Sequence, residues 1–150
     1  MADVTDVGTF RAADYPAHLF DLDGVITPTA EVHMRAWAQM FTDFLSSRGS
    51  SAPYTDQDYF AYVDGRPRYD GVRTFLASRS IELPEGEDSD PSTQPLGEET
   101  VRGLGNRKND LVLDLIRTAG VRPYPGTVAF LGALPGTARL AIVSSSRNAE

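Results

Sequence analysis

The sequence contains the stretch Phe20-Asp21-Leu22-Asp23-Gly24-Val25-Ile26-Thr27, in which two carboxylates follow an apolar run and precede a glycine. Side chains at positions i and i+2 of an extended strand leave the same face, so we expect Asp21 and Asp23 to project together. Adjacent carboxylates repel unless a cation or a shared proton relieves them, and Mg²⁺ prefers oxygen ligands. The stretch therefore predicts a metal and phosphoryl site. The alternative is a plain turn, where Asp and Gly are common.

Apolar periodicity predicts a strand, a long helical segment and a second strand. The first strand is expected over residues 17–20, as a short apolar run suited to a buried parallel strand. A helix follows from Pro28 to about Ser47, with Thr27 as its N-cap. The spacing of its apolar residues places one stripe on a single helical face, and core packing is the default meaning of such a stripe. The stripe consists of Trp37, Met40, Phe41, Phe44 and Leu45.

Four more helices and the second strand complete the expected order. One helix begins with a capping box of Thr55 and Asp58 and ends near Val63, before Gly65 in a left-handed conformation. The others are expected over residues 69–80, over residues 106–119 and, capped by Thr127 after the turn Tyr124-Pro125-Gly126, up to residue 134. The second strand is expected over residues 140–143. If the two strands are parallel neighbours, Asp21, Asp23 and Ser144 meet at the edge where open α/β sheets bind ligands.

Several segments in sequence order resemble one known enzyme family. Residues 20–27 resemble the first motif of the haloacid dehalogenase superfamily, and the later segments are similar to its beta-phosphoglucomutase subfamily. The similar segments are Thr29-Ala30-Glu31-Val32-His33 with Arg35-Ala36-Trp37, Gly65-Arg66-Pro67-Arg68, Asn106-Arg107-Lys108-Asn109, Tyr124-Pro125-Gly126 and Val143-Ser144-Ser145-Ser146-Arg147-Asn148. The chain departs from the subfamily at Pro28, where an acid is frequent, and at Arg147, where lysine is common.

The expected fold class is α/β, with a Rossmann-like parallel-sheet core and an inserted all-helical cap. Residues 1–30 and 122–150 are assigned to the core, and residues 31–121 to the cap. Two strands do not make a stable doubly wound sheet. The resemblance also implies a lysine and an acidic pair beyond the last motif, and the sequence ends at Glu150 before either. We therefore expect the core to be incomplete in this chain and to be completed by a further segment or by a second chain.

The resemblance implies stepwise phosphoryl transfer with bound Mg²⁺. Asp21 would be the nucleophile and form an aspartyl phosphate, and Asp23 would be the general acid and base. Both would hold the metal ion, and Ser144 would donate its hydroxyl to the phosphoryl oxygens. The other matching residues would bind the substrate, a sugar phosphate or bisphosphate. They are Thr29, His33, Trp37, Gly65, Arg68, Lys108, Asn109, Ser146, Arg147 and Asn148.

Several of these residues also have ordinary structural interpretations. Arg68 and Arg147 are compatible with surface charge. Lys108 and Asn109 fit a solvated helix start, and His33 fits a histidine at the edge of a core. Ser144 fits the capping of a strand end. These alternatives stay open at the level of sequence.

By the resemblance, the phosphate that does not react has its own set of ligands. These are Arg68, Ser146, Arg147 and Asn148, and a planar guanidinium suits such an oxyanion. A second phosphate site favours a phosphomutase that interconverts hexose 1-phosphate and hexose 6-phosphate. The alternatives are a sugar-phosphate phosphatase of the same superfamily and a truncated fragment that binds phosphate without turnover.

Composition bounds the class of protein. The chain has 150 residues, 41% of them hydrophobic and 23% charged, which is the range of globular proteins. The absence of cysteine excludes disulfides and thiolate metal sites. The sequence has no apolar stretch long enough for a membrane span and no basic stripe typical of nucleic-acid binding, and its first 18 residues lack the basic-then-apolar pattern of a leader, so we expect no secretory signal. We expect a cytoplasmic enzyme without membrane or nucleic-acid partners.

The formal charge of −7 comes from one segment. Residues 82–99 contain seven acids and neither Lys nor Arg, whereas acids and bases balance in the rest of the chain. The segment is also rich in Pro and Gly, which disfavours helix and strand. It is interpreted as a solvated loop or a disordered insertion. The alternative is an acidic docking segment.

Overall fold

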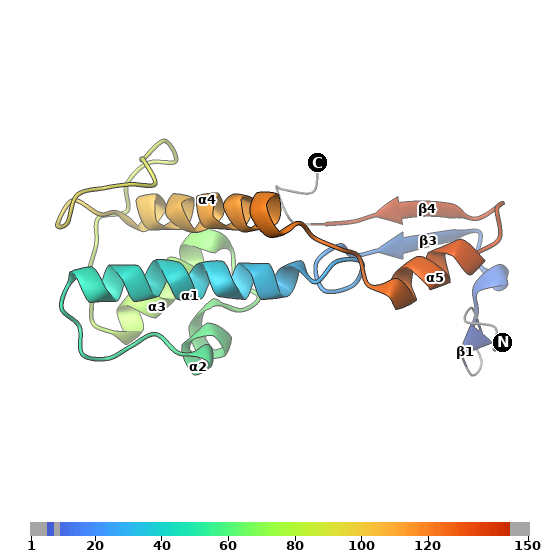
Figure 1. The fold of residues 1–150 in the computed structure, drawn as a ribbon, viewed down its shortest axis with the longest axis horizontal. Helices are drawn as coiled ribbons and strands as arrows, with labels where there is room; N and C mark the ends of the chain where they lie inside the picture. The colour runs from blue at the N-terminus through green and yellow to red at the C-terminus, as the bar shows by residue number, and fades with distance from the viewer. Residues whose placement is uncertain (1–5, 8–9, 145–150) are drawn as a thin grey trace. The chain divides into compact units, whose positions relative to one another are not determined.

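The computed structural model of the chain describes residues 6–7 and 10–144 and contains both helices and a small parallel sheet. This mixture confirms an α/β chain. The contacts divide the chain into two compact units, Met1–Glu31 with Gly120–Glu150 and Val32–Ala119. Figure 1 shows the elements of each unit. The assignment of these segments to a core and a cap stays a prediction.

The first unit contains two small sheets and one helix beside them. An antiparallel pair and a 3₁₀ turn, η1, precede the parallel pair formed by β3 and β4, in which Ala17 lies opposite Arg139 and Phe20 opposite Ile142. The two strands expected from the sequence are therefore parallel neighbours. The bounds are β1 (Asp6–Val7), β2 (Phe10–Arg11), η1 (Ala12–Asp14), β3 (Ala17–Phe20), α5 (Pro125–Ala133) and β4 (Arg139–Ile142).

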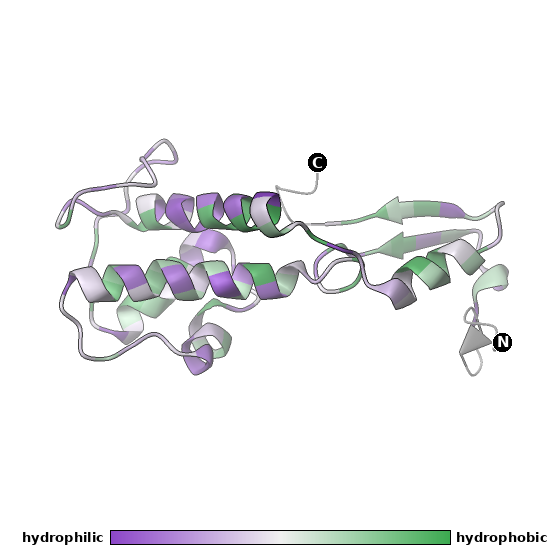
Figure 2. Ribbon diagram, viewed as in Figure 1, coloured by the Kyte–Doolittle hydropathy of each residue, from purple (hydrophilic) through white to green (hydrophobic). Residues whose placement is uncertain are grey.

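The expectation that residues 17–20 form a buried strand is wrong for most of its residues. Leu19 is 72% exposed, and all four residues of β4 are exposed, with Ile142 at 59%. On the other face of β3, the Phe20 ring packs edge-on against Phe130 of α5 with 6.2 Å between ring centres. Side chains alternate between the two faces of a strand, so α5 covers Phe20 and leaves Leu19 uncovered. Figure 2 shows the apolar residues along both strands.

The second unit is helical, and its core is the stripe predicted from the sequence. Trp37, Met40, Phe41, Phe44 and Leu45 are all at most 5% exposed. The Phe41 ring lies 5.4 Å from the Trp37 ring and 4.0 Å from the Phe75 ring, measured between centres. The helical bounds are α1 (Thr29–Ser47), which begins in the first unit, α2 (Asp56–Asp58), the π-helix η2 (Tyr59–Val63), α3 (Arg68–Ser78) and α4 (Val101–Ala119).

The capping predicted around Thr55 is confirmed. The Thr55 hydroxyl accepts from the Asp58 backbone N–H, and the Asp58 carboxylate accepts from the Thr55 N–H. Gly65 follows η2 with φ of +69°, the left-handed conformation expected of it. This turn leads the chain into α3, so the local sequence signals determine where α3 begins.

The start of α4 differs from the prediction by five residues. The sequence predicts this helix from about Asn106, and the glycines just before it, Gly103 and Gly105, have low helix propensity. It begins at Val101, and the hydroxyl of Thr100 accepts from the Gly103 N–H at 2.9 Å. Gly105 is needed for close packing, because a Cβ there would lie 2.5 Å from Cδ1 of Tyr69, whereas a Cβ at Gly103 would meet the flexible end of the Gln94 side chain. Tertiary contacts therefore override the local preference.

Two smaller predictions of helix starts are also corrected. The helix α1 begins at Thr29, one residue after Pro28. The helix α5 begins with Pro125 in its first turn, so the predicted turn is part of this helix. Thr127 does not cap α5, because its hydroxyl donates to the Val25 carbonyl at 2.7 Å. The Thr127 hydroxyl, which the local pattern assigns to the cap of α5, therefore bonds a residue that is distant in sequence.

The acidic segment has neither helix nor strand, as predicted, but its acids are not simply solvated. Glu99 is 7% exposed and accepts from Nη2 of Arg48 at 2.9 Å. Glu85 pairs with Arg73 and Arg102, the latter also pairing with Asp88. The segment contains no base of its own, and its partners, one just after α1 and the others on α3 and α4, cannot be found by counting charges within the segment.

Burial and hydrogen bonding act in opposite directions on Glu99. Burial favours the neutral acid, but the backbone N–H groups of Glu99 and Gly97, together with Arg48, stabilise the carboxylate. The balance lowers the pKa of Glu99 below its ordinary value. The ion pair between Glu99 and Arg48 thus fastens the acidic segment to the helical unit.

None of the helices in the described part of the chain is long and apolar enough to cross a membrane.

Candidate active site

Asp21 and Asp23 lie immediately beyond the carboxyl end of β3. The strand ends at Phe20, whose carbonyl accepts from the Val143 N–H at 2.8 Å. Because Phe20 lies opposite Ile142, the residues that follow β4, including Ser144, lie at the same carboxyl end of the parallel pair as Asp21. Ser144 is half-buried. The structure thus brings the three residues predicted as catalytic to one end of the parallel pair.

A tight loop determines where the two carboxylates lie. The Leu22 carbonyl accepts from the N–H groups of Ile26 and Thr27, both at 3.0 Å, and the Gly24 N–H donates to the Thr27 carbonyl at 2.7 Å. Gly24 has φ of +80°, which a residue with a side chain rarely adopts. The D-x-D-G pattern therefore forms a specific backbone turn between β3 and α1.

The two carboxylates have different surroundings. Asp21 is exposed, and its Oδ1 accepts from the Leu22 N–H at 2.7 Å. Asp23 is half-buried, and its Oδ1 accepts from the hydroxyl of Thr29, a residue only 7% exposed. The Thr29 hydroxyl also lies 3.0 Å from that of Thr27. Asp21 is accessible to a ligand, whereas the side chain of Asp23 is held in one orientation.

The donor chemistry of this loop fits a hard divalent cation. Asp21 offers an accessible carboxylate, and the backbone carbonyl of Asp23 would add a second oxygen ligand of the kind that Mg²⁺ accepts. Within residues 6–7 and 10–144, no three His, Asp or Glu side chains gather into a metal site. The two aspartates would therefore form part of a ligand shell.

Three residues predicted to bind substrate meet inside the helical unit. Lys108 is 5% exposed, and its Nζ lies 2.7 Å from Nδ1 of His33 and 5.1 Å from the centre of the Trp37 ring. A lysine ammonium only donates, so the ring nitrogen of His33 accepts in this pair. The interpretation of Lys108 as part of a solvated helix start is wrong, since Lys108 lies in the middle of α4 and is buried. Trp37 is a core residue, and its contact with a substrate stays a prediction.

Arg68 and Asn109 form a second pair in the same unit. Nη2 of Arg68 donates to Oδ1 of Asn109 at 2.9 Å. Arg68 is the first residue of α3, three positions after Gly65, and it is half-buried. Of the other predicted phosphate ligands, Ser146, Arg147 and Asn148 lie outside the described residues.

Sequence reasoning assigned no role to Tyr69 and Asn106, which adjoin this pair. The Tyr69 hydroxyl donates to Oδ1 of Asn106 at 3.0 Å. Asn106 and Asn109 are three residues apart on α4, a spacing that puts both on one helical face. That spacing is the sequence signal that points to a shared role.

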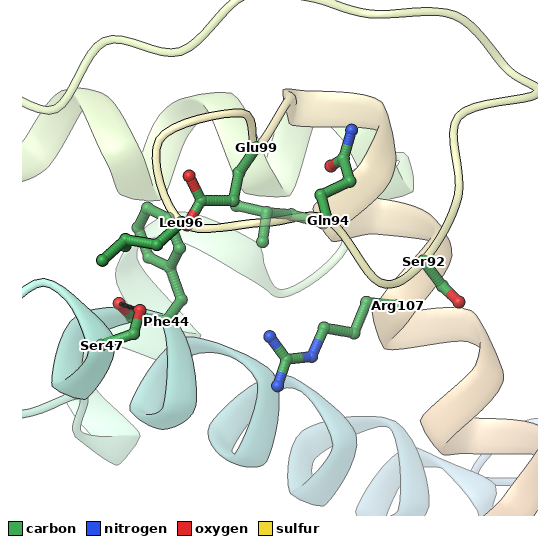
Figure 3. A pocket seen from close by; sticks show the side chains of 8 residues that line it. Phe44, Ser47, Ser92, Gln94, Leu96, Glu99 and Arg107 are labelled. Carbon is green, nitrogen blue, oxygen red and sulfur yellow. Dashed lines mark hydrogen bonds between the residues drawn. The ribbon is translucent and has the colours of Figure 1, made fainter.

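A small cavity lies elsewhere in the helical unit, beside the acidic segment (Figure 3). Its volume is about 110 Å³. Arg107 extends from α4 beside it, with Nη2 3.3 Å from Oδ2 of Asp43. None of the predicted site residues is among those that line it, which are Phe44, Ser47, Ser92, Gln94, Leu96, Glu99, Leu104 and Arg107. The cavity is therefore a feature of the acidic segment and the helices below it.

Comparison with known proteins decides the relationship. No protein-family model matches the chain. Proteins named beta-phosphoglucomutase from Mycobacterium bovis and Mycobacterium tuberculosis are 45% identical to it over 139 residues, which are 88% of this chain. The chain is a relative of the beta-phosphoglucomutases. This relationship confirms the resemblance to the haloacid dehalogenase superfamily that the motifs indicated.

The chain spans about half, 52%, of the length of these curated relatives. A further relative is a protein of Mycobacterium tuberculosis described as an uncharacterized glycosyl hydrolase. It is 34% identical over 140 residues, which are 89% of this chain and 10% of that protein. Segments similar to this chain thus occur in proteins of very different length.

Proposed function

We propose that the protein is a magnesium-dependent phosphomutase that interconverts hexose 1-phosphate and hexose 6-phosphate through an aspartyl phosphate. The observation that carries this proposal is the different setting of the two carboxylates beyond β3. Asp21 is exposed, whereas Asp23 is oriented by Thr29. The 45% identity to proteins named beta-phosphoglucomutase supports the same assignment.

The setting of each carboxylate suits one step of the reaction. A carboxylate oxygen of Asp21 attacks phosphorus in line, so that an O–P bond forms while the bond from phosphorus to the leaving sugar oxygen breaks. Asp23 gives its proton to that leaving oxygen and later removes a proton from the incoming hydroxyl. The hydrogen bond from Thr29 keeps the Asp23 carboxyl group in one orientation for both transfers.

The remaining groups of the loop and of β4 stabilise charge. A magnesium ion held by the Asp21 carboxylate and the Asp23 backbone carbonyl would neutralise negative charge that accumulates at the phosphoryl group. The Ser144 hydroxyl would donate to a phosphoryl oxygen from the end of the neighbouring strand. A donor that is already in place costs little reorganisation, and the bond from the Val143 N–H to the Phe20 carbonyl holds the backbone next to Ser144.

We assign the first unit to a Rossmann-like core and the second to an inserted helical cap. The parallel pairing of β3 with β4 and the purely helical content of Val32–Ala119 support this division. The apolar side chains Leu19, Leu140 and Ile142 are all more than half exposed. Exposed apolar strands with open edges are costly, so further strands from the same polypeptide or from a second chain would complete the sheet.

Arg68 is proposed to bind the phosphate that does not react, and its partner Asn109 is assigned, with Lys108 and His33 of the same unit, to the rest of the substrate. A phosphatase needs one phosphoryl site, whereas a mutase must hold either end of a bisphosphate while the other end reacts. The guanidinium of Arg68 suits a phosphate oxyanion, which favours the mutase.

The aspartyl phosphate provides the direct test. The protein, with its metal site complete, is incubated with glucose 1,6-bisphosphate labelled at phosphorus, and covalently bound label is measured. Asp21→Asn should abolish the label, while Asp14→Asn, at an exposed residue of η1, should leave it unchanged. Label that persists in Asp21→Asn would refute the assignment of the nucleophile. Release of glucose 6-phosphate identifies the mutase, release of inorganic phosphate the phosphatase, and absence of any label in the unchanged protein the non-catalytic fragment.

A further inference from the structure

We propose that Tyr69 and Asn106 are positioning residues for Arg68, and that the acidic segment over residues 82–99 anchors them. The inference rests on the proposed function, in which Arg68 binds the non-reacting phosphate. It gives the acidic segment a role that its composition did not reveal. The segment would hold the phosphate-binding side chain in place through two intermediate residues.

The side-chain amide of Asn106 connects the acidic segment to α3. Its Nδ2 donates to the backbone carbonyls of Asp88 at 3.1 Å and Asp90 at 2.9 Å. Its Oδ1 accepts from the Tyr69 hydroxyl at 3.0 Å. Because backbone carbonyls only accept, the two contacts with the segment leave the amide a single orientation, with its oxygen toward Tyr69.

The ring of Tyr69 is held from several directions. Gly105 of α4 comes so close that an added Cβ would lie 2.5 Å from Cδ1 of the ring. The guanidinium carbon of Arg102 lies 4.7 Å from the ring centre, within the range of a cation–π contact. Arg102 itself pairs with Glu85 and Asp88 of the acidic segment. The segment therefore acts on Tyr69 through both Asn106 and Arg102.

Arg68 lies against this fixed ring. Its guanidinium carbon is 5.7 Å from the centre of the Tyr69 ring, and Nη2 donates to Asn109. An added Cβ at Gly105 would also lie 3.3 Å from Cδ of Arg68. A free arginine side chain samples many rotamers, and ordering it on binding reduces affinity. The contacts with Tyr69 and Asn109 fix much of that freedom before a phosphate arrives.

Binding of glucose 6-phosphate, measured by calorimetry on the full chain, tests the role of Tyr69. Tyr69→Phe removes only the hydroxyl and should raise Kd about fivefold, the order expected for one neutral hydrogen bond. In the Arg68→Ala background the same change should have no further effect, because it acts through Arg68. Tyr62→Phe, a matched control in η2, should leave Kd unchanged. An equal loss with and without Arg68 would mean a merely structural role and would overturn the proposal.

Asn106→Asp tests the link to the acidic segment. Aspartate keeps an acceptor for Tyr69 but cannot donate to the carbonyls of Asp88 and Asp90, and its charge is repelled by them. We expect at least the loss of affinity seen in Tyr69→Phe, again only when Arg68 is present. An unchanged Kd for glucose 6-phosphate would refute the contribution of the segment.

A measurement without ligand separates this inference from the proposed function. Hydrogen exchange of the Arg68 Nε–H group, followed by NMR, should accelerate in Tyr69→Phe and in Asn106→Asp but not in Tyr62→Phe. Unchanged exchange in both variants would overturn the positioning role. If Arg68→Ala alone leaves binding of glucose 6-phosphate unchanged, the proposed function fails, and the exchange experiment still decides whether Tyr69 and Asn106 hold Arg68.

Discussion

Replacing Gly105 with alanine tests how closely α4 packs on α3. In an open helix position, Gly→Ala stabilises by about 1 kcal/mol. At Gly105 the new Cβ would lie 2.5 Å from Cδ1 and 2.6 Å from Cε1 of Tyr69. The ring cannot easily move, because its hydroxyl is bonded to Asn106. Overpacking of this kind costs about 1–3 kcal/mol. The expected outcome for Gly105→Ala is a net destabilisation of up to about 2 kcal/mol once the gain in helix propensity is subtracted.

The assay is urea unfolding followed by the fluorescence of Trp37, the single tryptophan of the chain, which lies in the helical core. Gly103→Ala is the matched control on the same helix, since its Cβ meets only the flexible end of Gln94, and it should change the midpoint little. In the Tyr69→Ala background the ring is gone and only Cδ of Arg68, at 3.3 Å, has to shift slightly, so Gly105→Ala should stabilise by up to about 1 kcal/mol. A midpoint for Gly105→Ala equal to or above that of the unchanged protein would refute the close contact.

Two further predictions concern phosphate binding and pH. Arg68→Ala should reduce turnover of a sugar bisphosphate far more than hydrolysis of a small phosphoester, because Arg68 is assigned to the phosphate that does not react; equal losses in steady-state assays would contradict this. The pKa of Glu99 is lower in the folded protein than its ordinary value of 4.5. The stabilisation from Glu99 is therefore fully present above pH 4.5 and is lost as pH falls through the lowered value. Urea midpoints should fall in acid, and Glu99→Gln should reduce that fall; an unaltered pH profile would argue against the anchor.

Local sequence signals were sufficient where neighbours in sequence carry the interaction. The apolar stripe from Trp37 to Leu45 gave both the helix α1 and its buried face, because a period of 3.6 residues places those side chains together. The capping box of Thr55 and Asp58 was equally predictable, since both partners lie within one turn. At the candidate site, the same reasoning located Asp21 and Asp23 beyond a strand and Ser144 beyond its parallel neighbour.

Signals of this kind failed where the partner is distant in sequence. The early start of α4 depends on Gly105 packing against Tyr69, a contact between two helices. The charge of the acidic segment is balanced at Glu99 by Arg48, 51 residues away. Thr127 was assigned to a cap and instead bonds Val25, 102 residues away. No local pattern contains such pairs, so the helix start and the environment of each acid were not predictable.

The sequence by itself determined the order of the elements from β3 onward, the helical core stripe and the two aspartates beyond a strand, since each depends on the geometry of one strand, helix or turn. Only the tertiary structure decided the burial and the hydrogen-bond partners of the functional side chains. It buried Lys108 against His33 and Trp37, paired Arg68 with Asn109, and connected Asn106 to the acidic segment. The physical reason is that burial and hydrogen-bond partners are properties of surfaces brought together by folding, and residues far apart in the chain supply those surfaces.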